Sequence, residues 1–75
     1  MKEKINYIKE LAEDLGYIQL SQKCGKYYAV TYDDVSVVVL YFVGKNGYDG
    51  TELEKLSKKV INTIYQDLFD DFGEQ

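Results

Sequence analysis

The chain has 75 residues, a formal net charge of −4 at pH 7 and an apolar fraction of 45%. This length fits a single domain, residues 1–75, and the apolar fraction is that of a folded globular protein rather than a disordered chain. No stretch is long and apolar enough to cross a membrane, and no apolar segment of the kind found in secretory signals follows the first lysines. We therefore expect a cytoplasmic domain that has no membrane partner.

The residue types that most enzymes and metal sites need are scarce. The chain has no histidine and a single cysteine, Cys24, so it cannot form an internal disulfide and lacks the ligands of structural zinc. Its positive residues are all lysines, whereas arginine makes the bidentate contacts to phosphate and guanine. The composition predicts no cofactor and no metal, and it argues against direct nucleic-acid binding.

Residues 2–15 have the spacing of an amphipathic helix. Apolar residues recur at steps of three and four and form one stripe: Ile5, Ile8, Leu11, Ala12 and Leu15. Gly16 follows as a left-handed C-terminal cap.

Three strands are expected next, at residues 17–23, 26–32 and 35–43. Tight turns at Cys24-Gly25 and Asp33-Asp34 join them, and residues 44–47 form a loop. Pairing the strands across these turns predicts one face that the helices cover, made of Ile18, Leu20, Tyr27, Ala29, Val38, Leu40 and Phe42. The opposite face would carry Tyr17, Gln19, Ser21, Tyr28, Val30, Tyr32, Val35, Val37, Val39 and Tyr41. A slip of one residue at Asp33-Asp34 would reverse the third strand, and truncating a buried Leu40 to alanine should cost ~2–5 kcal/mol.

A second helix is expected to begin at a capping box, in which Thr51 caps the helix and Glu54 reaches back to it. The apolar stripe widens from Val60 onward, beyond what one face of a small sheet requires. The elements together predict an α+β fold of order α-β-β-β-α, a three-stranded antiparallel meander with two helices packed on one face.

Each connection in this order reverses the chain, so the two helices should point the same way and end beside the Asp33-Asp34 turn. Acidic residues would gather there without any lysine among them: Glu13, Asp14, Asp33, Asp34, Asp67, Asp70, Asp71 and Glu74. Five lysines, at positions 2, 4, 23, 26 and 45, would lie near the opposite end. Such a charged pole can steer a basic partner, or it can serve solubility alone.

The sequence contains no complete motif for nucleophilic or acid–base catalysis, phosphate binding or calcium binding. Cys24 has no histidine to activate it and is expected to be a surface thiol in a turn near lysines. The adjacent carboxylate pairs lie at expected helix ends and turns, where they are solvated. The glycine-containing loop at residues 44–50 lacks the lysine of a phosphate-binding loop and the last glutamate of a calcium loop.

The order α-β-β-β-α with parallel helices resembles that of double-stranded-RNA-binding domains over nearly the whole chain. Residues 5–16 look like that family's first helix, and Lys58-Lys59 is similar to its basic pair. The expected turn at Cys24-Gly25 is shorter than the family's loop and carries no histidine, and the expected second helix opens with Glu52 and Glu54 instead of lysines. Small acidic phage inhibitors, including some anti-CRISPR proteins, also resemble this order and charge, although no motif assigns the chain to them.

The leading hypothesis is a non-enzymatic module that binds a basic protein partner, as an inhibitor or nucleic-acid mimic would, through the acids and aromatics near the second helix. The expected binding residues are Glu13, Asp14, Asp33, Asp34, Tyr65, Asp67, Phe69, Asp70, Asp71 and Phe72. The aromatics could instead close the end of the core. A homodimer through the Tyr/Val sheet face is the alternative, and duplex-RNA binding is a third hypothesis. Replacing Asp67, Asp70 and Asp71 with asparagine is expected to leave the fold intact.

Overall fold

The first helix forms where the sequence pattern places it. A computed structural model describes residues 1–73, and in it α1 spans Lys2–Leu15. Ile8 and Ala12 are its fully buried residues, and Gly16 ends the helix at a φ of 82° while its N–H donates to the carbonyl oxygen of Ala12. Glycine takes this positive φ at no steric cost, which explains why the helix stops there.

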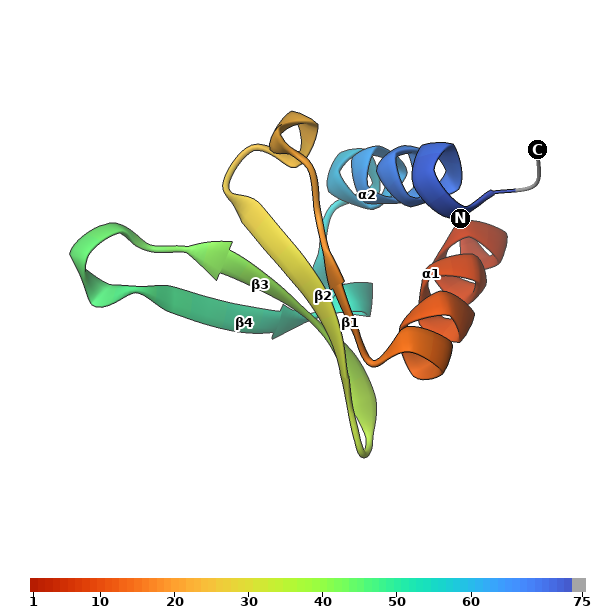
Figure 1. Ribbon diagram of the computed structural model, residues 1–75, viewed down its shortest axis with the longest axis horizontal. Helices are drawn as coiled ribbons and strands as arrows, with labels where there is room; N and C mark the ends of the chain where they lie inside the picture. The colour runs from red at the N-terminus through yellow and green to blue at the C-terminus, as the bar shows by residue number, and fades with distance from the viewer. Residues whose placement is uncertain (74–75) are drawn as a thin grey trace.

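Four antiparallel strands follow, in the spatial order β1-β2-β3-β4, as Figure 1 shows. They span Tyr17–Gln19 (β1), Tyr27–Asp33 (β2), Ser36–Phe42 (β3) and Tyr48–Glu52 (β4). The α+β class is confirmed, but the three-stranded meander is wrong. The fourth strand was missed because its residues are mostly exposed and include Asp49 and Gly50, so it has no apolar alternation.

The second helix begins later than the sequence pattern suggested. Thr51 pairs with Val39 in the sheet, a short 3₁₀ turn at Leu53–Lys55 follows, and α2 spans Lys58–Phe72. Ser57 is the true N-cap, because its hydroxyl accepts a hydrogen bond from the N–H of Val60. The predicted capping box is therefore wrong.

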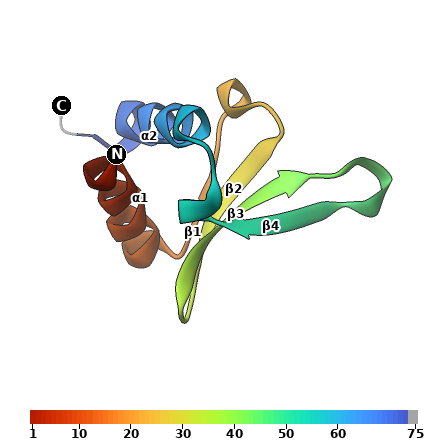
Figure 2. The ribbon, with the colours of Figure 1, turned by 180° about the vertical axis from the view of Figure 1, so that it is seen from behind.

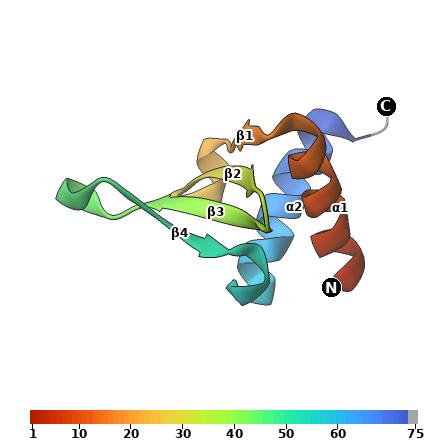
Figure 3. The same cartoon turned by 90° about the horizontal axis from the view of Figure 1, so that it is seen from below.

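The two helices pack on the same face of the sheet and run in the same general direction (Figure 3). The pairs of residues in contact advance together along both helices, from Lys4 with Asn62 to Tyr7 with Tyr65. The helices nevertheless cross steeply in Figure 1, and their C-terminal ends lie apart. The predicted common direction rested on three strands, and with four strands the same count of chain reversals would point α2 the other way. The core between helices and sheet consists of Ile8, Ala12, Ile18, Leu20, Cys24, Val30, Val37, Val39, Leu53, Ile61, Ile64 and Leu68.

The faces of β2 and β3 are the reverse of those predicted. A two-residue turn at Cys24-Gly25 would pair Ile18 with Thr31, but β1 ends at Gln19 and the chain makes a 3₁₀ turn at Gln22–Cys24 before β2. Ile18 therefore pairs with Val30, a slip of one residue that turns β2 over and β3 with it. Val30, Val37 and Val39 lie in the core, whereas Ala29, Val38 and Leu40 lie on the uncovered face.

Two strands keep the predicted faces in part. Ile18 and Leu20 are buried toward the helices as predicted. A β-bulge between Tyr27 and Ala29 turns Tyr27 back toward the helices, where it packs against the core. The β3–β4 hairpin extends away from both helices (Figure 1), so it is the least covered part of the sheet.

Candidate functional site

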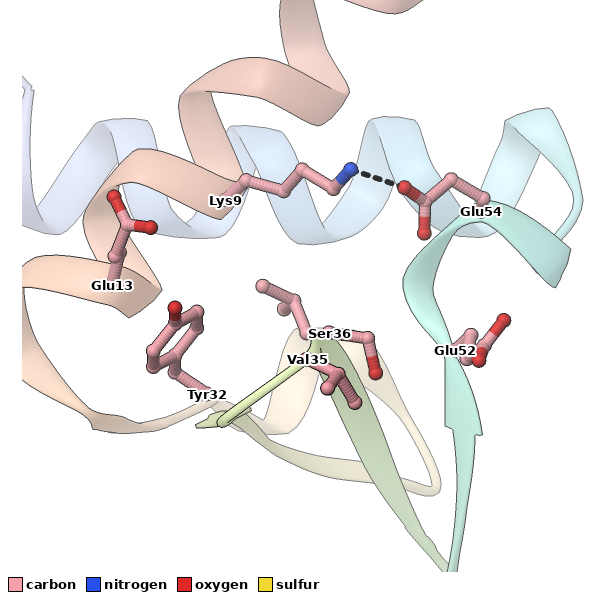
Figure 4. Close-up of a pocket in the computed structure, with 8 residues that line it drawn as sticks. Lys9, Glu13, Tyr32, Val35, Ser36, Glu52 and Glu54 are labelled. Atoms are coloured by element: carbon pink, nitrogen blue, oxygen red, sulfur yellow. Dashed lines mark ion pairs between the residues drawn. The ribbon is translucent and has the colours of Figure 1, made fainter.

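An open groove of about 460 Å³ lies between the end of α1, the β2–β3 turn and the segment after β4. Figure 4 shows its lining. We call it the acidic groove, and its residues are Lys9, Glu13, Tyr32, Val35, Ser36, Val37, Glu52 and Glu54. The short turn between β4 and α2, which carries Glu54, lies beside α1 in the view from behind (Figure 2). The end of α1 and the stretch from Glu52 to Glu54 thus bring carboxylates to one opening, and the β2–β3 hairpin adds uncharged side chains.

The groove combines charge with exposed apolar surface. Glu13, Glu52 and Glu54 contribute three carboxylates against one lysine. That lysine, Lys9, forms an ion pair with Glu54, which lowers the pKa of the Glu54 carboxyl. Val35 is 90% exposed at the tip of the β2–β3 turn, so it can contact the aliphatic part of a bound side chain.

The neighbouring turn adds to the negative charge. Asp34 and Val35 form the β2–β3 turn, one residue later than predicted, because Asp33 still pairs with Ser36 at the end of β2. One oxygen of Asp33 accepts hydrogen bonds from the N–H groups of Val35 and Ser36. Asp14 is exposed at the end of α1. The structure therefore brings four predicted residues, Glu13, Asp14, Asp33 and Asp34, to the end of the sheet where the groove opens.

The acids of α2 do not join this group. Asp67 and Asp70 contact the loop between β1 and β2, which lies at the other end of β2 from the β2–β3 turn. Asp71 and Phe72 are exposed near the end of α2, and Glu74 lies outside the described residues. The single acidic pole predicted from the sequence is wrong, because the α2 acids belong to a second location.

Lysines also lie closer to the acids than predicted. Lys23 was expected at the opposite end, but its Nζ is 2.7 Å from Oδ2 of Asp70 and 3.8 Å from Oδ1 of Asp67. Lys23 lowers the pKa of Asp70, and the hydrogen bond to Asp70 raises the pKa of Lys23. Lys55 lies 4.0 Å from Glu52 beside the acidic groove. The expectation that the acids have no lysine among them is therefore wrong at both locations.

Asp67 is a buried carboxylate with a structural role. It is 1% exposed and accepts hydrogen bonds from the backbone N–H of Ser21 at 2.9 Å and from the Ser21 hydroxyl at 2.6 Å. The Cys24 thiol lies 3.7 Å from its Oδ2 and donates to it. These contacts fasten the β1–β2 loop to α2. A sequence signal existed, because Asp67 falls on the same helix stripe as Ile64 and Leu68.

Cys24 is buried, which corrects the expectation of a surface thiol. It is 5% exposed, and burial together with the nearby Asp67 charge raises the pKa of its thiol to about 12. A buried, protonated thiol is a poor nucleophile. The sequence pattern predicted an exposed turn at Cys24, because it gave no indication of the 3₁₀ turn at Gln22–Cys24 that buries this side chain.

This burial gives a direct test with a thiol reagent. At about pH 8 only on the order of one Cys24 side chain in ten thousand is ionised in the folded protein. Labelling by a colorimetric disulfide reagent should therefore be slow in native buffer and fast in denaturant. Fast labelling in native buffer would contradict both the burial and the raised pKa of Cys24.

The predicted aromatic residues of α2 are partly used inside the molecule. The Tyr7 ring of α1 contacts Tyr65 at 5.3 Å and Phe69 at 6.0 Å between ring centroids, and Tyr65 stacks on Phe69. Lys4 lies over the Tyr65 ring. Phe69 remains 39% exposed and Phe72 47% exposed. The widened stripe thus serves the helix–helix contact and leaves two rings partly open to solvent.

No three potential metal-ligating side chains lie together among residues 1–73, and no helix in that range is long and apolar enough to span a membrane. Searches against protein-family models, curated proteins and solved structures found no match to this chain.

Proposed function

We propose that this chain is a non-enzymatic module of the cytoplasm that binds a basic protein partner through the acidic groove. One observation carries the proposal: Glu13 at the end of α1 and Glu52 and Glu54 at and after the end of β4 place three carboxylates around one open groove of about 460 Å³. Lys9 already forms an ion pair with Glu54 there, as a lysine or arginine of a partner could with the remaining acids. The single cysteine fits a reducing compartment.

The partner's chemistry follows from the lining. Val35 and Tyr32 offer apolar surface beside Glu13 and Glu52. The aliphatic part of a long basic side chain can pack on Val35 and Tyr32, and its charged end can then reach Glu13 and Glu52. A partner that handles nucleic acid presents such side chains, so the groove could occupy its phosphate-binding surface in the manner of an inhibitor.

The test compares two variants that lose the same charge. Glu13→Gln with Glu52→Gln removes two carboxylates from the groove, and Glu3→Gln with Glu10→Gln removes two exposed ones from α1 outside it. The probe is a short, labelled arginine-rich peptide, with an uncharged peptide of equal length as control. Fluorescence anisotropy should show affinity falling about tenfold or more for the groove variant and less than about twofold for the α1 variant.

The dependence of affinity on salt is a second measurement. Affinity for the arginine-rich peptide should fall steeply as ionic strength rises. Equal losses in the two variants would mean that only net charge matters and would contradict the groove. The natural partner can then be sought by comparing the proteins that the wild-type chain and the groove variant retain from host extract.

Duplex RNA should be tested as a ligand in the same anisotropy assay, because the structure is closer to double-stranded-RNA-binding domains in two respects than the sequence suggested. Two differences from double-stranded-RNA-binding domains disappear in the structure, because α2 opens at Lys58-Lys59 and the β1–β2 loop is longer than a two-residue turn. Lys23 of that loop is nevertheless paired with Asp70, and a fourth strand is present. Binding of duplex RNA at physiological salt would favour the RNA hypothesis over the proposed function.

A further inference from the structure

The sheet has one face that neither helix covers. Ile18, Val30 and Val39 point into the core between sheet and helices, so their neighbours along each strand point the other way. A Cβ atom at Gly50 would lie 2.7 Å from Val38 Cγ1 and 3.2 Å from Leu40 Cδ2, which places both side chains on this uncovered face. They lean across Gly50 and fill the space that it leaves.

Aromatic rings continue this surface. The Tyr28 and Tyr48 rings lie 4.6 Å apart between centroids, and Tyr48 meets Phe42 edge-on at 5.5 Å. Partial burial and the neighbouring Tyr28 hydroxyl raise the pKa of Tyr17, and Tyr17, Phe42 and Tyr48 are each about half exposed. We call this surface the aromatic sheet face, and it consists of Tyr17, Tyr28, Val38, Leu40, Phe42 and Tyr48. Large exposed apolar patches of this kind mark interaction sites.

The charged residues of this face lie at the two ends of its strands, and its middle is apolar. On strand positions that face this side, the charged residues within residues 1–73 are Asp33 and Glu52, both at the end beside the acidic groove. Lys45 lies at the opposite end, in the 3₁₀ turn Gly44–Asn46 that joins β3 to β4. A partner that covers this face therefore needs an uncharged apolar centre, positive charge at one end and negative charge at the other.

A second copy of the same face meets these requirements in one orientation. Two face-to-face sheets related by a two-fold axis along the strands would place Asp33 and Glu52 opposite their own copies, which is repulsive. An axis across the strands places the acidic end of each copy over the Lys45 turn of the other. We propose that the chain forms a homodimer through the aromatic sheet face, with the strands of the two copies running in opposite directions across the interface.

The proposal does not rest on the acidic groove, and its test uses the intact chain. Sedimentation equilibrium over a range of concentrations should show a monomer–dimer equilibrium for the wild type. Phe42→Asp should weaken the dimer about tenfold or more, because it replaces an aromatic ring with a carboxylate at the end of the face that lies over the acidic end of the second copy. Tyr48→Asp is a second variant with the same expectation, and circular dichroism checks that each variant is folded.

Phe72→Asp is the matched control for these variants. Phe72 is 47% exposed and Phe42 is 51% exposed, but Phe72 lies at the end of α2 away from the sheet. This control should leave the dimer unchanged although it adds the same charge. Equal weakening by Phe72→Asp would overturn the assignment of the interface to the aromatic sheet face.

A charge exchange tests the orientation. Lys45→Glu alone should weaken the dimer, and adding Glu52→Lys should restore it, because the two positions meet across the two-fold axis. Failure of the double variant to recover would overturn the antiparallel arrangement. A wild-type chain that stays monomeric at high micromolar concentration would overturn the dimer itself.

Discussion

Replacing Asp67 with alanine should lower the free energy of unfolding by about 2–4 kcal/mol. The change leaves the Ser21 N–H, the Ser21 hydroxyl and the Cys24 thiol without the acceptor that they share, in a part-buried to buried setting. A domain of this size has a total stability of roughly 4–11 kcal/mol, so the loss is a large fraction of it. Urea denaturation followed by circular dichroism measures the effect.

Asp70→Ala is the matched control. Asp70 lies on the same helix as Asp67, and it contacts the same β1–β2 loop through Lys23. The Asp70 side chain is 47% exposed, and its ion pair with Lys23 is screened by solvent, so the variant should be far more stable than Asp67→Ala. Equal destabilisation by the two variants would contradict a special role for the buried carboxylate.

Two further measurements connect the loss to the Asp67 contacts. In a double-mutant cycle, Ser21→Ala and Asp67→Ala should be less than additive, since both remove the 2.6 Å hydrogen bond. Thiol labelling of Cys24 should also become faster in Asp67→Ala, because the β1–β2 loop is no longer held to α2.

The expectation that asparagine at positions 67, 70 and 71 leaves the fold intact must be revised. An amide in place of the Asp67 carboxylate has a single acceptor oxygen and cannot accept all three hydrogen bonds.

The features that the sequence predicted well are those set by local pattern. The stripe of α1 and Gly16 define the first helix. The alternating direction of α1, β1 and β2 brought Glu13 and the acids Asp33 and Asp34 to one end of the sheet. Each of these inferences needs a short span of residues and no knowledge of how two strands align.

Features that depend on cross-strand alignment were not predictable in this way. Val37, Val38, Val39 and Leu40 are all apolar, so their pattern does not distinguish the covered from the uncovered face. The connection after β1 decides the alignment, and the 3₁₀ turn at Gln22–Cys24 has no strong signal in its sequence. Because Glu52 and Glu54 were assigned to a helix start, their place in the acidic groove was missed as well.

Two adjacent valines give the sharpest test of the alignment. Val39 is fully buried in the core and pairs with Val30, whereas Val38 lies half-buried on the uncovered face beside Gly50. Val39→Ala should therefore cost about 2–3 kcal/mol of unfolding free energy, and Val38→Ala about 1 kcal/mol or less. Both variants make the same chemical change in the same strand, so any difference in strand propensity cancels between them.

This comparison also separates folding from self-association. Urea unfolding at low micromolar concentration reports on the monomer, where only contacts within the chain contribute. At higher concentration Val38→Ala should lose stability relative to the wild type, because Val38 belongs to the aromatic sheet face and helps to hold the proposed dimer. The reverse result at low concentration, with Val38→Ala the more damaging change, would restore the strand faces inferred from the sequence and place the helices on the other side of the sheet.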